Sequence, residues 1–300
     1  MIIGFIGVGT MGGPICSNLL RQTDHDIRVF DLNDEAVARV EALGATRSGL
    51  AELCAAADVI LTSLPAVSIV EKIALGEDGV LGNAKPGTTY IDLSTTSVSS
   101  TRAIAAKLAA AGIDMLDAPI STSADQAGRG EMAMMVGGDP EVFERHRELF
   151  HTMGDPDKVF YVGGIGNGLV VKIVNNYLAQ AYTAAASEAF AVGVSAGIDA
   201  QVLHNAISQS SGNSMMYQVL ANRALAGRYD DPDFTLDLGY KDAQLFLELS
   251  DDLKIPTPIG SDVHTQMRFA LGGDRGKLDH TVVMRVYEDL LGIDISQHEG

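Results

Sequence analysis

The stretch IIGFIGVGTMGG, residues 2–13, decides the fold class of this chain. Residues 2–6 form a short apolar run that ends at a glycine, which predicts a buried strand. A helical pattern follows the glycines and continues to Gln22. A strand, a glycine-rich loop and a helix in this order are typical of the first unit of a dinucleotide-binding domain.

The glycines between this strand and this helix have the spacing G-x-G-x-x-G. The first permits a tight turn, the second lets backbone approach a pyrophosphate, and the third lets helix and strand pack closely. Phosphates would meet unpaired N–H groups at the positive end of the helix. We therefore predict a cofactor-binding loop made of Gly7, Gly9, Thr10, Met11 and Gly12.

Asp31 ends the next predicted strand, residues 26–31, at the position where an acidic residue binds the adenosine ribose. A carboxylate there would repel the 2'-phosphate of NADP. Residues 32–34, LND, offer no arginine to receive that phosphate. The sequence therefore favours NAD over NADP as the cofactor.

Strands and helices alternate through the first half of the chain. We expect strands over residues 2–6, 26–31, 58–65, 88–94, 113–119, 131–138 and 158–163. We expect helices over residues 14–22, 35–43, 67–75, 100–112 and 141–150. This alternation predicts a doubly wound, mostly parallel sheet.

The second half has a different pattern. After a glycine-rich hinge, GGIGNG at 163–168, only helical patterns follow, over about 167–196, 199–210, 213–226, 237–252, 258–272 and 279–291. The predicted fold is therefore α/β, with an N-terminal Rossmann domain over 1–163 and an all-α domain over 164–300.

Composition excludes several classes of function. Of 300 residues 46% are hydrophobic, and the net charge is -18, which disfavours binding to nucleic acid or anionic membranes. No apolar run is long enough to span a membrane, and the apolar N-terminus lacks the basic leader of a signal peptide. Cys16 and Cys54 fit buried thiols in a reducing cytosol, so we expect a cytoplasmic protein. The seven histidines have no metal-ligand spacing, and we predict no metal site.

One apolar helix carries an unexpected polar stripe. The segment GLVVKIVNNYLAQAY, residues 168–182, places Lys172 and Asn176 one turn apart on the same face. A lysine whose pKa falls from about 10.4 by desolvation or a nearby cation can exchange a proton with a substrate hydroxyl. The alternative is a lysine that reaches solvent from an amphipathic helix.

Four motifs in order resemble those of the beta-hydroxyacid dehydrogenases, the family that includes 3-hydroxyisobutyrate dehydrogenase. They are GFIGVGTMGGPICSNLL at 4–20, LDAPIS at 116–121, GNGLVVKIVNN at 166–176 and FTLDLGYKDAQL at 234–245. The resemblance covers nearly the whole chain. It implies an NAD-dependent dehydrogenase, or semialdehyde reductase, that forms a homodimer or homotetramer through its helical domain.

The resemblance also implies a role for individual residues. Lys172 matches the catalytic lysine. Residues at the positions of the family's substrate contacts are Ser121, Thr122, Ser123, Asn176 and Asp242. Besides the glycine loop and Asp31, residues that match cofactor contacts are Leu64, Pro65, Thr95 and Lys241.

The chain departs from the family pattern at two places. Thr122 and Ser123 stand where the family has two glycines, and Val98 stands where it has a proline. The first departure lies in the substrate loop. It adds hydroxyl groups without adding charge, so we expect a substrate that carries an extra polar group.

The sequence thus predicts hydride transfer between NAD and a short 3-hydroxy acid or its semialdehyde, at a site between the domains. Two alternatives stay open, an imine reductase and a catalytically silent NAD-binding sensor or scaffold. Lys172 argues against the first, and the joint presence of Lys172, Asn176 and Ser121 argues against the second. The segment DHTVV, 279–283, is interpreted as the start of a surface helix, with closure of the pocket as the alternative.

Overall fold

The computed structural model describes residues 1–122 and 124–297. Its contacts divide the chain into two compact units, Met1–Lys172 and Ile173–Gly300, which we call the sheet unit and the helical unit. Within the described residues, no helix is both long enough and apolar enough to cross a membrane.

The sheet unit alternates strands and helices. Its strands are β1 (Ile2–Ile6), β2 (Asp26–Phe30), β3 (Thr46–Arg47), β4 (Val59–Thr62), β5 (Thr89–Asp92), β6 (Asp114–Asp117), β7 (Ile120–Ser121), β8 (Ala133–Gly138) and β9 (Val159–Tyr161). Its helices are α1 (Gly12–Gln22), α2 (Asp34–Glu41), α3 (Leu50–Ala56), α4 (Val67–Leu75), α5 (Val80–Asn83), α6 (Val98–Ala110), α7 (Ala124–Gly128), α8 (Pro140–Arg145), α9 (Arg147–Met153) and the 3-10 turn η1 (Pro156–Lys158). The predicted α/β class is confirmed.

The strand order in the sheet is β3-β2-β1-β4-β5-β6-β8-β7, and β9 pairs with β8. The chain runs outward from β1 to β3, then returns to pair β4 with the other side of β1. The order therefore reverses between β1 and β4. In open α/β sheets ligands bind beyond the carboxyl ends of the strands at such a reversal.

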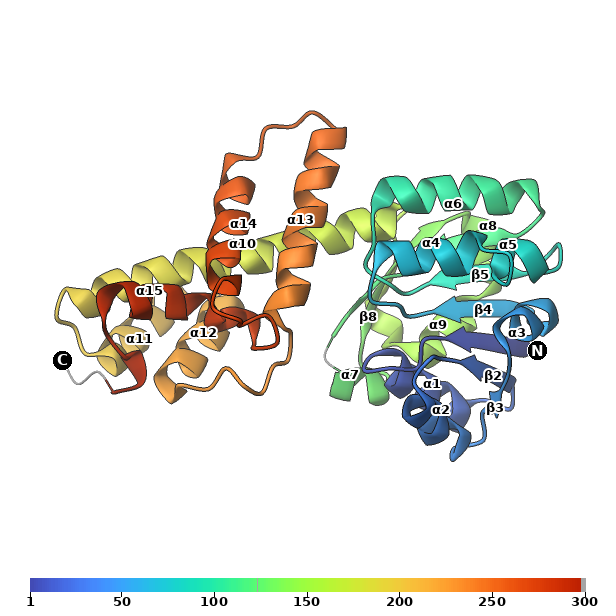
Figure 1. Ribbon diagram of the computed structural model, residues 1–300, viewed down its shortest axis with the longest axis horizontal. Helices are drawn as coiled ribbons and strands as arrows, with labels where there is room; N and C mark the ends of the chain where they lie inside the picture. The colour runs from blue at the N-terminus through green and yellow to red at the C-terminus, as the bar shows by residue number, and fades with distance from the viewer. Residues whose placement is uncertain (123, 298–300) are drawn as a thin grey trace. The chain divides into compact units, whose positions relative to one another are not determined.

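Helices cover both faces of this sheet (Figure 1). Side chains of alternate strand residues point to opposite faces, so β1 sends Phe5 into one apolar cluster and Ile6 into another. The first cluster packs against α1, α2, α8 and α9, and the second against α3, α4, α5 and α6. Two buried faces explain why the strands are apolar runs instead of alternating patterns.

The structure corrects several details of the predicted elements. It adds β3, α3, α5, β7 and α7, which are too short to show a period in the sequence. It also divides the single helix expected over 141–150 at His146, whose backbone (φ -109, ψ 9) leaves the helical region. The His146 ring lies buried, with its Nε2 2.9 Å from the Thr89 hydroxyl. The outer pairs β6–β8 and β7–β8 are antiparallel.

The helical unit contains the predicted helices in the predicted order. They are α10 (Asn167–Ser195), which begins in the sheet unit, α11 (Ala200–Ser208), α12 (Met215–Ala226), α13 (Leu236–Asp252), α14 (Pro258–Leu271) and α15 (Met284–Leu291), with the 3-10 turns η2 (His280–Val283) and η3 (Ile295–Gln297). One apolar core includes Phe190, Leu220, Leu236, Met267 and Val282.

The interpretation of residues 279–283 as a surface helix start is right about the helix, since the 3-10 turn η2 begins there, and wrong about the surface. All five residues are buried, with exposed fractions between 0 and 5%. Asp279 caps η2 through Thr281, and its other oxygen accepts the N–H of Asp233. The segment can lie in the core of the helical unit because its one acidic side chain, Asp279, has hydrogen-bond partners within the unit.

Candidate active site

The glycine-rich loop connects β1 to α1 at the carboxyl edge of the sheet. Gly7 has φ +89, and a Cβ there would lie 2.4 Å from the carbonyl oxygen of Ser63. A Cβ on Gly12 would lie 1.9 Å from the carbonyl oxygen of Gly7. A Cβ on Gly9, by contrast, would meet no atom of the described residues within 4 Å. Gly7 and Gly12 are therefore required by the fold itself, whereas Gly9 leaves open space beside the backbone.

This open space suits a pyrophosphate. It lies beside the N-terminus of α1, where no side chain of the described residues caps the helix. Backbone N–H groups and the helix dipole at such an end attract anions. Thr10 and Met11 occupy the loop between Gly9 and the helix, as the sequence predicted. The loop fits the diphosphate of a dinucleotide.

Asp31 directly follows β2 and is partly buried. Its Oδ2 accepts the N–H of Val8 at 2.8 Å, and its Oδ1 accepts the N–H of Asn33 at 2.8 Å. The carboxylate thus ties the end of β2 to the glycine loop. An ionised carboxylate has about four acceptor positions, so both oxygens can still accept ribose hydroxyls.

Leu64, Pro65 and Thr95 follow β4 and β5, on the same carboxyl edge as the glycine loop. The N–H of Leu64 donates to the Ser94 hydroxyl at 2.9 Å, which joins the two loops. The predicted cofactor residues of the sheet unit therefore follow four neighbouring strands, β2, β1, β4 and β5.

A buried polar network supports these loops. Asp92, at the end of β5, accepts hydrogen bonds from the Thr62 hydroxyl at 2.8 Å and the Ser94 N–H at 3.1 Å. Burial raises the pKa of Asp92 to about 6, although the hydrogen bonds from Ser94 and Thr62 oppose the shift. Our sequence interpretation missed this residue. Its only local signal is an acidic residue at the end of an apolar strand.

The predicted substrate loop begins on β7. Ser121 pairs in register with Ala133 of β8, and the Thr122 hydroxyl donates to the side-chain oxygen of Gln126 at 3.0 Å. Ser123 lies outside the described residues. The roles of Ser121, Thr122 and Ser123 in substrate binding stay predictions.

Lys172 lies near the beginning of α10 and is partly buried. The start of the helix is held by Asp117, the last residue of β6. Its Oδ1 accepts the N–H of Gly166 at 2.6 Å, and its Oδ2 accepts the N–H of Leu169 at 2.8 Å. The sequence placed Asp117 only within the LDAPIS motif and assigned it no role.

Asn176 is buried and forms part of a cluster in the helical unit. Its side-chain nitrogen donates to Oδ2 of Asp242 at 2.5 Å, and its side-chain oxygen accepts from Asn175 at 3.1 Å. Asp242 is 2% exposed and also forms an ion pair with Lys241 at 3.2 Å. The structure thus brings together three of the predicted site residues, Asn176, Lys241 and Asp242.

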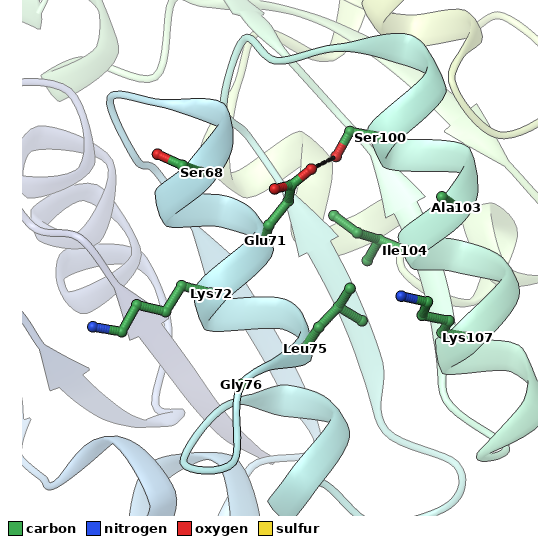
Figure 2. A pocket seen from close by; sticks show the side chains of 9 residues that line it. All are labelled: Ser68, Glu71, Lys72, Leu75, Gly76, Ser100, Ala103, Ile104 and Lys107. Carbon is green, nitrogen blue, oxygen red and sulfur yellow. Dashed lines mark hydrogen bonds between the residues drawn. The ribbon is translucent and has the colours of Figure 1, made fainter.

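Two surface hollows lie on the sheet unit. Figure 2 shows the hollow between α4 and α6, where Glu71 accepts a hydrogen bond from the Ser100 hydroxyl at 2.7 Å. It contains none of the predicted site residues. The other hollow adjoins the glycine loop at Gly9 and Thr10 and is lined by Arg21, Arg39 and Arg129. Within the described residues, no group of three or more His, Cys, Asp or Glu side chains is arranged to hold a metal ion.

Comparison with known proteins identifies the family. Residues 2–163 match the model described as the NAD binding domain of 6-phosphogluconate dehydrogenase. Residues 166–287 match the model described as NAD-binding of NADP-dependent 3-hydroxyisobutyrate dehydrogenase. The chain belongs to the 3-hydroxyisobutyrate dehydrogenase family. The resemblance seen in its motifs is thereby confirmed.

Relatives from this family align with nearly the whole length of the chain. A 2-(hydroxymethyl)glutarate dehydrogenase of Eubacterium barkeri is 35% identical over 98% of this chain and 97% of its own length. An NAD-dependent L-serine dehydrogenase of Pseudomonas aeruginosa is 35% identical over 97% of this chain and 99% of its own length. A solved 3-hydroxyisobutyrate dehydrogenase of Mycobacterium tuberculosis has a TM-score of 0.85 at 29% identity and covers 95% of this chain and 98% of its own.

The family member described here is an NAD(P)-dependent oxidoreductase that interconverts short hydroxy acids and semialdehydes. The alternatives are less well supported. An imine reductase of Myxococcus stipitatus shares the fold, with a TM-score of 0.65, but only 18% of the residues. The family models name both NAD and NADP, so they do not distinguish the two cofactors.

Proposed function

We propose that this enzyme uses NAD to oxidise a short 3-hydroxy acid that carries an extra polar group, or to reduce the matching semialdehyde, with Lys172 as the general acid/base. The observation that carries the proposal is the partly buried Lys172 within the motif GNGLVVKIVNN, one helical turn before the buried Asn176. The predicted division of the chain after residue 163 remains part of this proposal.

The protein has to accept the proton of the substrate hydroxyl during oxidation and return it during reduction. Oxidation of an alcohol to a carbonyl releases a hydride and the hydroxyl proton. When bound, the nicotinamide supplies the hydride chemistry. The amine of Lys172 takes the hydroxyl proton during oxidation, and the ammonium returns it to the carbonyl oxygen during reduction. Ser121 and Asn176 are the proposed contacts for the carboxylate and hydroxyl of the substrate, and Asp242 orients Asn176.

Asp31 supports NAD over NADP. Its carboxylate lies at the end of β2, already bound to the glycine loop through Val8. A second negative group beside it would be repelled. Leu32, next in the chain, is 91% exposed, and its side chain has no donor for a phosphate.

This preference can be tested by substitution. Asp31→Asn combined with Leu32→Arg removes the repulsion and adds a phosphate partner. The ratio of kcat/KM for NADP to that for NAD should rise at least about tenfold, the effect of about 1.4 kcal/mol. Asp31→Asn with Leu32→Gln is the control without the cation. A wild-type enzyme that prefers NADP would refute the assignment.

The substrate loop supports an extra polar group on the substrate. Thr122 and Ser123 replace the glycines that the family pattern has, and the Thr122 hydroxyl already orients Gln126. Two of the three relatives named above, the 2-(hydroxymethyl)glutarate dehydrogenase and the L-serine dehydrogenase, are named for substrates that carry a second charged group, a carboxylate or an ammonium. A site that hydrogen-bonds such a group discriminates against analogues that lack it.

The deciding experiment is a substrate panel followed at 340 nm. The panel contains 3-hydroxyisobutyrate, glycerate, threonate, L-serine and sulfonated three-carbon alcohols. We expect a polar member to exceed 3-hydroxyisobutyrate in kcat/KM by at least about tenfold. The double variant Thr122→Gly/Ser123→Gly should lower the ratio of kcat/KM for the polar substrate to kcat/KM for 3-hydroxyisobutyrate. No turnover of any member with either cofactor would overturn the proposed function.

A further inference from the structure

The start of α10 is capped from outside the helix. A helix leaves its first N–H groups without internal partners, and a side chain at the N-cap usually satisfies them. The residue before Asn167 is Gly166, which has no side chain. Asp117 supplies the missing acceptor from the end of β6, 49 residues away in the chain. Its two oxygens accept the N–H groups of Gly166 and Leu169.

This arrangement does the work of a capping box with one carboxylate. In a capping box, one side chain binds the third N–H of the helix and another binds the N–H of the N-cap. Asp117 binds both positions. It also places a carboxylate at the positive end of a helix of 29 residues. The contact therefore fixes both the position and the direction of the first turn of α10.

The same contact explains two glycines, Gly168 at the start of α10 and Gly137 of β8. A Cβ on Gly168 would lie 2.2 Å from the carbonyl oxygen of Met135 and 2.8 Å from Oδ2 of Asp117. A Cβ on Gly137 of β8 would lie 2.5 Å from Oδ1 of Asp117. Gly166 has φ +86, which an L side chain rarely adopts. Gly137 and Gly168 are therefore small because the helix start, β8 and Asp117 meet without room for side chains, whereas Gly166 is explained by its positive φ.

We infer that Asp117 is the positioning residue for Lys172: by capping the first turn of α10 from β6, it sets where the lysine amine lies. The inference rests on the proposed role of Lys172. The lysine follows Leu169 by three residues, less than one turn, so a shift of the first turn moves it directly. Asp117 is 1% exposed, and its oxygens are directed at the helix, so it acts through α10.

The effect of a displaced lysine differs from a general loss of folding. Misplacing a reacting group by about 1 Å can cost about 100-fold in rate. Partial unfolding instead lowers the number of competent molecules and leaves each one unchanged. The measurement is therefore kcat per NADH-binding site, with the sites counted by calorimetric titration, together with KM for the best hydroxy acid of the panel.

Asp117→Asn keeps the size of the side chain and places an N–H₂ group against one of the two helix N–H groups. We expect kcat per NADH-binding site to fall at least about tenfold. KM for the hydroxy acid and the NADH affinity should change less than about threefold. Asp139→Ala is the matched control, because Asp139 caps α8 in the same unit through Glu141 and Val142. It should keep the wild-type kcat per site.

Gly168→Ala reaches the same contact without removing the carboxylate. Its methyl group pushes the helix start away from Asp117, so it should reproduce the loss of kcat per site. Gly164→Ala is its control, because a Cβ on Gly164 meets no described atom within 4 Å. Hydrogen exchange of the amides of residues 166–172 should speed up in Asp117→Asn and Gly168→Ala, and not in the two controls.

The outcomes separate the inference from the proposed function. Wild-type kcat per site or unchanged amide exchange in Asp117→Asn and Gly168→Ala would overturn the inference and leave the function intact. Loss of NADH binding in both variants would overturn it too, because Asp117 would then support the whole sheet unit. A wild-type enzyme without turnover on the panel overturns the function and the catalytic meaning of the cap together.

Discussion

Lys172 begins a row of polar side chains along α10. Asn176, Gln180, Thr183 and Ser187 follow on the same side of the helix, with exposed fractions between 0 and 8%. Each has a partner: Asn176 binds Asp242, Gln180 binds His280, and the two hydroxyls bind carbonyl oxygens one turn back. The polar row on an apolar helix is therefore a buried, hydrogen-bonded seam. The lysine at its head is partly buried, in keeping with the proposed proton transfer.

Lys172→Met removes the proton carrier and keeps the length of the side chain. We expect kcat to fall at least about 100-fold, the lower range for acid–base catalysis. NADH affinity should change little, because the predicted nucleotide contacts are mainly on the sheet unit. Lys107→Met is the control, because Lys107 lies exposed beside the hollow of Figure 2. A Lys172→Met enzyme with wild-type turnover would contradict the assignment.

The buried carboxyl group of Asp92 should make the stability of the folded protein depend on pH. Burial raises its pKa from 3.8 to about 6, so the folded state binds this proton more tightly than the unfolded state. Its contribution is therefore most favourable below about pH 4 and is lost as the pH rises through about 6, by up to about 3 kcal/mol. Asp92→Asn removes this titration. The Tm of the variant minus that of the wild type should rise between pH 4 and pH 7, and a flat difference would refute the assignment.

The unit made of β1, the glycine loop and α1 contains glycines of two kinds, some that the fold requires and one that leaves room for a ligand. Gly12 lies where a Cβ would clash with the carbonyl of Gly7, and Gly9 lies where a Cβ would meet open space. The same motif thus contains one glycine that the fold requires and one that leaves room for a ligand.

Gly12→Ala should lower the Tm by several degrees, because β1 and α1 must separate to admit the methyl group. Gly9→Ala should keep the Tm within about 1 °C, because a Cβ there meets no described atom within 4 Å. It should nevertheless weaken NADH binding at least about tenfold, measured by calorimetry. Wild-type NADH affinity in Gly9→Ala would argue against a ligand beside Gly9.

At the scale of the whole molecule, the helical unit has several large apolar side chains exposed on its surface. Val192, Val202, Met215, Phe269 and Leu290 are each between 58 and 78% exposed. A subunit interface would cover exposed apolar side chains of this kind. The homodimer or homotetramer that the resemblance implies stays a prediction, and the solution mass tests it.

The chain mass is 31.6 kDa. Light scattering after size exclusion at physiological salt should give two or four times this value. The mass should hold in high salt as well, because an apolar interface between chains of net charge -18 is strengthened when the charges are screened. A monomer at micromolar concentration would refute the proposed assembly.

Most elements and the glycine loop could be predicted from the sequence, because period and turn chemistry are local. The order of hydrophobic runs predicted β1, β2, β4, β5 and β6 and the long helices of the second half. Short elements such as β3 and α3 were missed because they show no period. The break at His146 was missed because no glycine or proline marks it; the His146 ring there lies buried against Thr89 of β5.

The sequence by itself determined the fold class, the family motifs and the candidate residues for cofactor and proton transfer. Only the tertiary structure decided which polar groups meet: Asp117 with the start of α10, Asn176 with Asp242, and Gln180 with His280, a pair 100 residues apart. It also decided that residues 279–283 are buried. The physical reason is that periodicity reports only which face of an element is apolar. The partner of a buried polar group depends on segments that meet only in the folded chain.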